Sequence, residues 1–186
     1  MSRILTEEIR LKFGYDELFS PAGEYAPARI GKKWFHTRAD GTRAYENEFD
    51  EIDDFYEGLA KARNRGNVFH IRTNGKPAYD RVFEWAGNFS EGLCPAYDGK
   101  KFFHIRFNGK PAYRYRYVNV DGFTEGLARA QDSAGLFHIS HDGKPLYKNR
   151  YIDVRSFFQG KAMIRIGEMK HSAIYPDGKR VKKQKE

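Results

Sequence analysis

The sequence predicts an all-β fold assembled from tandem repeats, and three observations lead to that prediction. Residues of one kind recur at a period of 34 along the 186-residue chain, as Phe35, Phe69, Phe103 and Phe137 show. Each unit contains short runs in which apolar and polar residues alternate, the period of a half-buried strand. Glycine and proline interrupt each unit too often for two amphipathic helices, which excludes the helical repeats of the same length.

The third unit, which begins at Phe103, illustrates how the elements are assigned. Residues 103–106 alternate apolar and polar side chains, which indicates a strand. Asn108-Gly109 follows and predicts a tight hairpin of type I′, because that turn requires positive φ at both central residues. Residues 117–120 and 125–130 are predicted to be two further short β segments.

The two ends of the chain look like halves of one unit. Five Asx-Gly pairs are present but only four Phe-His pairs, and residues 27–35 align with residues 95–103 at twice the period. Pairing strands from both ends would remove two open sheet edges. We therefore predict a closed five-unit toroid, propeller-like, with small blades of three to four strands. An open β-solenoid of 34-residue repeats is the alternative.

This arrangement predicts one repeat domain over residues 15–181. Residues 1–14 are expected to form an N-terminal extension with a short helix over residues 5–13, and residues 182–186 form a basic tail. The predicted units are residues 35–68, 69–102, 103–136 and 137–170, and a split unit from residues 15–34 and 171–181.

The repeat resembles the bacterial WG (KWG) β-repeat family, whose unit has a Trp-Gly pair, an Asx-Gly-Lys turn and a Phe-x-Glu-Gly-Leu-Ala segment. The last segment matches at Glu57–Ala60, Glu91–Cys94 and Glu125–Ala128. Trp34 keeps the tryptophan, but phenylalanine stands where the family has glycine, so a Phe-His pair replaces this part of the motif in a divergent branch. The resemblance implies a repeat scaffold and lends no catalytic residues.

The composition favours a protein of the cytoplasm over a membrane or exported protein. No apolar run approaches the ~20 residues that span a bilayer, the mean hydropathy is −0.78, and no export signal is visible at the N-terminus. Cys94 is the one cysteine and aligns with alanine in other units, which indicates a small core position. We expect a cytoplasmic, monomeric protein that is not an enzyme, with no cofactor, metal or membrane partner.

Charge is distributed unevenly along the chain. The net charge is +8, and residues 179–186 supply half of it. Residues 46–57 contain seven acids and no lysine or arginine. The body is therefore polarised between an acidic and a basic sector rather than uniformly basic.

The four phased histidines are the first candidate site. In a ring they could converge on an axis and bind a metal or an anion. Because each recurs in an equivalent place, we instead expect each to make a local hydrogen bond within its own unit. They are His36, His70, His104 and His138.

Residues that depart from the repeat, or that share a strand face with the histidines, are better candidates for binding a partner. Trp85 stands where other units have polar residues, and Tyr115 is flanked by two arginines. Aromatic and arginine side chains together anchor protein partners or stack on bases and sugars. The candidates are Arg38, Arg72, Trp85, Arg106, Arg114, Tyr115 and Arg116.

These observations predict a non-enzymatic repeat scaffold that mediates protein–protein interaction. Nucleic-acid or ribosome association through the basic sector and tail is one alternative, which predicts a steep dependence of affinity on salt. Carbohydrate binding at repeated pockets is another. A hydrolase with paired carboxylates is disfavoured, because equivalent glutamates in equivalent units lack the unlike environments that an acid and a base need.

Overall fold

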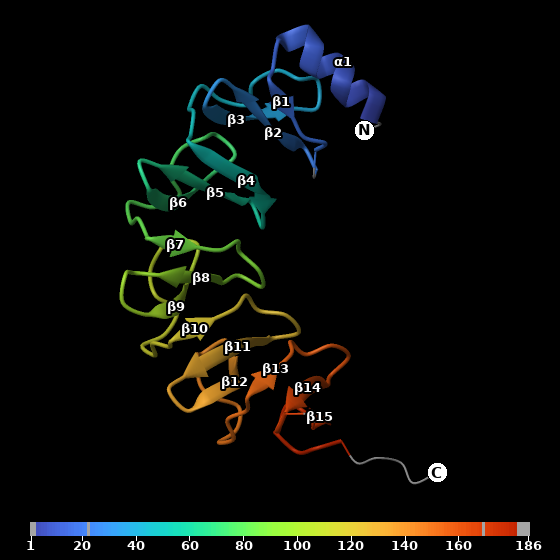
Figure 1. Cartoon of the computed structure of the whole chain (residues 1–186). Coiled ribbons are helices and arrows are strands. Elements are labelled where there is room, and N and C mark those ends of the chain that lie inside the picture. Colours follow the sequence, from blue (N-terminus) through green and yellow to red (C-terminus); the bar gives the residue numbers. More distant parts are fainter. Residues whose placement is uncertain (1–2, 22, 169, 182–186) are drawn as a thin grey trace. The chain divides into compact units, whose positions relative to one another are not determined.

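The computed structural model in Figure 1 describes residues 3–21, 23–168 and 170–181. Within these residues, one helix accompanies fifteen strands, which form five three-stranded sheets. In every sheet the order of the strands follows their order in the chain. The described residues group into two compact units, residues 1–88 and residues 89–186, where the sequence predicts one repeat domain.

Unit 1 contains helix α1 and the first seven strands. Its core includes Phe35, Phe49 and Ile71, which are buried. Its elements are α1 (Arg3–Phe13), β1 (Glu17–Leu18), β2 (Tyr25–Ile30), β3 (Lys33–Arg38), β4 (Glu51–Tyr56), β5 (Leu59–Asn64), β6 (Asn67–Ile71) and β7 (Trp85–Ala86).

Unit 2 contains the remaining eight strands around a core that includes Phe123, Phe137 and Ile164. Small alanines alternate with exposed or half-buried side chains along its central strands, as in the pattern expected for strands with one buried face. Its strands are β8 (Cys94–Tyr97), β9 (Phe102–Ile105), β10 (Asn119–Val120), β11 (Leu127–Asp132), β12 (Gly135–Ser140), β13 (Asp153–Val154), β14 (Ala162–Arg165) and β15 (His171–Ile174).

The sheet composition corrects the predicted split unit. The first sheet runs from Glu17 to Arg38 and the fifth from Asp153 to Ile174, so no described sheet combines strands from both ends of the chain. A period does not determine where a unit starts. The predicted units begin at the Phe-His strand, which is the last strand of each of the first four sheets, so the predicted boundary divides the first sheet. The predicted basic tail, residues 182–186, lies outside the described residues.

The hairpins use two turn types, and the assignment of type I′ to Asx-Gly was wrong. Gly109 has φ of 73° but Asn108 has no positive φ. The Gly109 amide donates to the Arg106 carbonyl at 2.9 Å, and the Arg106 amide donates to the Lys110 carbonyl at 2.9 Å. This is a type I turn closed by a left-handed glycine, the three-residue hairpin.

The Glu-Gly pairs form type I′ turns instead. Glu91 and Gly92 have φ of 54° and 78°, and the Ser90 amide donates to the Leu93 carbonyl at 2.9 Å. Glutamate rarely adopts positive φ. Glutamate nevertheless recurs at this position. The need for a two-residue hairpin loop therefore outweighs the preference of glutamate for negative φ.

Helix α1 lies in the extension where the sequence predicts a short helix. It packs on the first Asx-Gly turn so closely that a Cβ at Gly41 would collide with Ile9 and Phe13. In later repeats the glycine packs instead on the tyrosine ring of the preceding repeat: Gly75 on Tyr45, Gly143 on Tyr113 and Gly178 on Tyr147. The helix therefore replaces a preceding repeat. No helix in the described part of the chain has the length and apolar character needed to cross a membrane.

Candidate functional site

The four phased histidines are buried and fully hydrogen-bonded. Each Nδ1 lies 2.5 or 2.6 Å from a tyrosine hydroxyl nine residues later, and each Nε2 lies 2.8 to 3.0 Å from a backbone carbonyl. A carbonyl only accepts, so Nε2 carries the hydrogen and Nδ1 accepts from the hydroxyl. The pairs are His36–Tyr45, His70–Tyr79, His104–Tyr113 and His138–Tyr147.

These hydrogen bonds join consecutive sheets. His104 belongs to β9, and its Nε2 donates to the carbonyl of Asp121, directly after β10 of the next sheet. Burial lowers the pKa of His36, His70 and His104 to about 4, so the rings are neutral at pH 7. The expected local bond is therefore present in the tyrosine contact, and the bond to the next sheet is an addition that the sequence did not predict.

The fifth sheet lacks this histidine. Met163 pairs with Ala173 in the register where Arg129 pairs with His138 in the fourth sheet. His171 lies two residues earlier, opposite Arg165. Both nitrogens of each phased histidine form hydrogen bonds, so each ring connects its own hairpin to the next sheet. Among the described residues, no three histidine, cysteine or carboxylate side chains gather as a metal site would require.

Removing one tyrosine hydroxyl tests how much these histidine hydrogen bonds stabilise the fold. Tyr113→Phe leaves the buried Nδ1 of His104 without its donor, so we expect the free energy of unfolding to fall by about 1–3 kcal/mol. Tyr115→Phe is the matched control, because Tyr115 is half-buried like Tyr113 but its hydroxyl forms no hydrogen bond within the described part of the chain. Urea unfolding followed by circular dichroism measures both variants. Equal losses in the two variants would contradict the role of the His–Tyr pair.

Arg38, Arg72 and Arg106 brace their own hairpins. Each lies at the end of a Phe-His strand and is exposed, whereas the histidine two residues earlier is buried. The Nη2 atom of Arg72 donates to the Ala78 carbonyl at 3.0 Å, and Arg38 and Arg106 repeat the contact at 3.0 and 3.2 Å. These guanidinium groups therefore stabilise the loops of their own hairpins.

Arg116 is held by hydrogen bonds to the backbone, whereas no such bond holds Arg114 among the described residues. The Arg116 guanidinium lies 4.1 Å from the centre of the Phe103 ring and donates to the carbonyls of Tyr113 and Tyr115 at 3.1 and 2.9 Å. The Arg114 guanidinium is exposed and lies 5.4 Å from the half-buried Tyr115 ring. Trp85 is 41% exposed and lies on β7 of unit 1. The structure thus distributes the candidates over both units.

The acidic sector, residues 46–57, is largely neutralised by cations. Four of its acids form ion pairs: Glu48 with Arg43 at 2.9 Å, Asp50 with Lys33 at 2.6 Å, Asp53 with Lys61 at 2.9 Å, and Glu51 with Arg63 at 3.4 Å. Exposed pairs of this kind contribute little to stability, but they reduce the negative charge that the sector presents to a partner.

The basic sector of unit 2, residues 106–116, keeps its charge. It contains Arg106, Lys110, Arg114 and Arg116 and no acid, and none of these four takes part in an ion pair among the described residues. Phe107 adds an exposed aromatic ring that stacks on Phe89 at 4.7 Å. The sector is therefore a charged surface with aromatic side chains.

One pattern in these loops was not predicted from the sequence. The position after the recurring tyrosine of each repeat is Glu46, Asp80, Arg114 and Lys148 in turn. The loop thus changes from acidic in unit 1 to basic in unit 2. Aligning this loop across the repeats would have revealed the change, because the residues stand exactly one period apart.

The family model for the WG containing repeat matches residues 5–34, 48–67 and 71–102. The 34-residue spacing continues beyond the last matched stretch. No curated protein gives a significant match to the chain.

Two solved structures are similar in fold. One is Hsv2 of Kluyveromyces lactis with loop 6CD replaced by a Gly-Ser linker, at 11% identity and a TM-score of 0.50, covering 81% of this chain and 61% of that one. The other is BamB from Moraxella catarrhalis, at 8% identity and a TM-score of 0.51, covering 89% and 59%. Both are propeller proteins, so the fold is propeller-like. The chain spans about three fifths of their length.

Proposed function

Because the chain belongs to the WG-repeat family, we propose that it is a non-enzymatic scaffold that binds a protein partner through the basic sector of unit 2. A propeller-like repeat fold serves as a scaffold or interaction module. The observation that carries the proposal is the unpaired charge of residues 106–116, with the Arg114 guanidinium exposed beside the Tyr115 ring. An acidic protein surface is the partner that this chemistry fits.

The repeated glutamates support a scaffold rather than an enzyme. The Glu91 carboxylate accepts the Gly126 amide at 2.9 Å, and the Glu125 carboxylate accepts the Gln159 amide at 2.7 Å. Each carboxylate therefore holds the turn of the following repeat. The groups that a hydrolase would need as acid and base are used here as structural acceptors.

We also propose that α1 is the N-terminal cap of the repeat array. A closed toroid, as the sequence predicts, would place a tyrosine from another repeat against Gly41. Ile9 and Phe13 of α1 occupy that position. This contact favours the alternative of an open array, in which the end repeat is covered by a dedicated element.

Charge reversal at Arg114 tests the binding surface. We expect Arg114→Glu to weaken partner affinity about tenfold or more, because it replaces attraction with repulsion at the centre of the sector. Lys148→Glu is the matched control, since it makes a similar change at the equivalent position of the next repeat. A partner captured from nuclease-treated host lysate would be identified and then titrated against each variant by biolayer interferometry. Unchanged affinity in Arg114→Glu would overturn the proposal, and capture abolished by nuclease would favour nucleic acid.

A further inference from the structure

One face of each sheet is normally covered by the sheet that follows it. In the fourth sheet, Arg129 and His138 are cross-strand partners on this face. His138 Nε2 lies 2.8 Å from the Arg155 carbonyl, and Arg129 Nη1 donates to the Val154 carbonyl at 3.1 Å. Both bonds attach the fourth sheet to the fifth. A face of this kind therefore carries donors that hold the next sheet.

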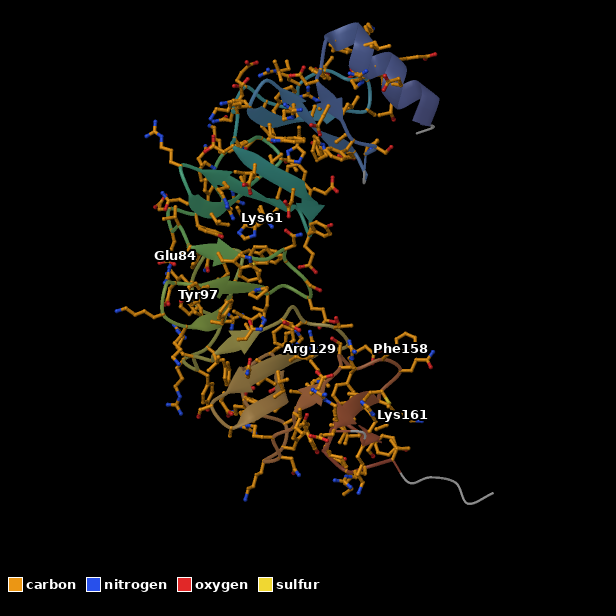
Figure 2. The ribbon with its side chains drawn as sticks, viewed as in Figure 1. Lys61, Glu84, Tyr97, Arg129, Phe158 and Lys161 are labelled. Atoms are coloured by element: carbon orange, nitrogen blue, oxygen red, sulfur yellow. The ribbon has the colours of Figure 1, made fainter. Side chains whose placement is uncertain are left out.

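The fifth sheet presents the same face without those donors. Met163 and Ala173 occupy the positions of Arg129 and His138, and neither side chain can donate a hydrogen bond to a neighbouring backbone. Met163 is 50% exposed and Tyr175 is 41% exposed. Lys161 Nζ lies 5.9 Å from the centre of the Tyr175 ring, and Figure 2 shows Lys161 and Phe158 at this end of unit 2. Within the described residues, this face is apolar at its centre and exposed.

Cations surround this apolar centre. Arg165 lies opposite both Asp153 and His171, so it shares the face with Met163, two residues away in β14. Its Nε is buried and has no hydrogen-bond partner among the described residues. Arg155 is 74% exposed, and its Nε lies 3.9 Å from the carboxylate of Asp153. Three cationic side chains, Arg155, Lys161 and Arg165, thus stand against one carboxylate.

We propose that this face, defined by Arg155, Lys161, Met163, Arg165 and Tyr175, docks an acidic segment of a partner protein. Carboxylates of the segment pair with the exposed cations Arg155 and Lys161. An apolar side chain of the segment covers Met163 beside Tyr175. Two copies paired through this same face are a poorer arrangement, because the cations of one copy would lie against those of the other. The inference rests on the proposed function for the class of partner, but it uses a separate surface.

Methionine-methyl NMR of the full chain tests the proposal. The chain has three methionines, Met1, Met163 and Met169, so the Met163 methyl resonance can be assigned with a Met163→Leu variant. The probe is a soluble copolymer of glutamate and tyrosine, which combines carboxylates with apolar rings. We expect the Met163 resonance to shift saturably, and the Arg155→Glu/Lys161→Glu double variant to need about tenfold more probe. Lys148→Glu should stay within about twofold of the parent.

Each other outcome overturns the proposal. An unmoved Met163 resonance, or equal titrations for the parent and the double variant, would remove this face as a docking surface. A tighter saturable shift with poly(U) would assign the face to nucleic acid, and a shift that depends on protein concentration without probe would assign it to self-association. Arg114→Glu separates this inference from the proposed function, since it should leave the Met163 titration unchanged even where it abolishes capture of the partner.

Discussion

Lowering the pH from 7 to 4 is expected to remove most of the stability of the protein. The pKa of His36, His70 and His104 is lowered to about 4 in the folded chain, against about 6.5 in an unfolded chain. Below pH 6.5 the unfolded state therefore binds protons that the folded state does not. Each histidine lowers the free energy of unfolding by about 3 kcal/mol once the pH has fallen to its pKa in the folded state. Three such losses are comparable to the whole stability of ~5–15 kcal/mol of a typical domain.

Urea unfolding at a series of pH values between 7 and 4.5 measures this effect. Most of this window lies above the ordinary pKa of carboxyl groups, which is near 4. His171→Ala is the control, since His171 is exposed and lies outside the His–Tyr pairs. It should leave the dependence on pH nearly unchanged. A free energy of unfolding that stays constant from pH 7 to pH 5 would show that the buried rings are not held neutral.

The second large effect is expected at Gly143. Gly143 and Gly126 have nearly the same φ, 77° and 76°, but a Cβ at Gly143 would collide with the Tyr113 ring, whereas nothing lies within 4 Å of a Cβ at Gly126. Alanine at either position bears the cost of the left-handed backbone, ~1 kcal/mol. Gly143→Ala adds the displacement of a ring that is bonded to His104. We expect it to lose about 3 kcal/mol in total.

Comparing Gly143→Ala with Gly126→Ala by thermal and urea unfolding isolates this contact, because the backbone term cancels between the two variants. The difference between them should be about 2 kcal/mol. Equal destabilisation would mean that the Tyr113 ring moves aside freely, and that the packing of glycine on tyrosine does not hold adjacent repeats together.

The sequence contained enough information to predict the strands and the hairpins but not where each sheet begins. Alternation over residues 103–106 and the Asx-Gly pairs depend on local chemistry, and local chemistry is visible in a sequence. The start of a sheet depends on which strands pair, which is a long-range property. The turn type at Asn108-Gly109 failed for a related reason. A glycine at positive φ suits both hairpin types, and the number of loop residues between paired strands decides between them.

In the candidate site, too, the local contacts could be predicted from the sequence and the long-range contacts could not. A hydrogen bond within the unit was expected for the histidines, and the tyrosine contact provides it. Their second bond goes to a backbone carbonyl of the next sheet, and a sequence does not show which carbonyl lies near a given side chain. Alternation placed Arg106 on the same face as His104 but could not show that the strand ends there, which lets the arginine fold back on its own loop. The apolar replacement at Met163 was visible only once the register of the fifth sheet was known.

The Glu–turn contacts make the repeats interchangeable at their junctions. Glu91 holds the turn of the next repeat in the same way that Glu125 holds the turn after it, so the donors and acceptors at one boundary match those at another. If one whole internal repeat were duplicated or lost, the repeats brought together would still have matching hydrogen-bond donors and acceptors at their boundary. Proteins built this way can vary in length during evolution by unequal recombination, without any single residue having to change first.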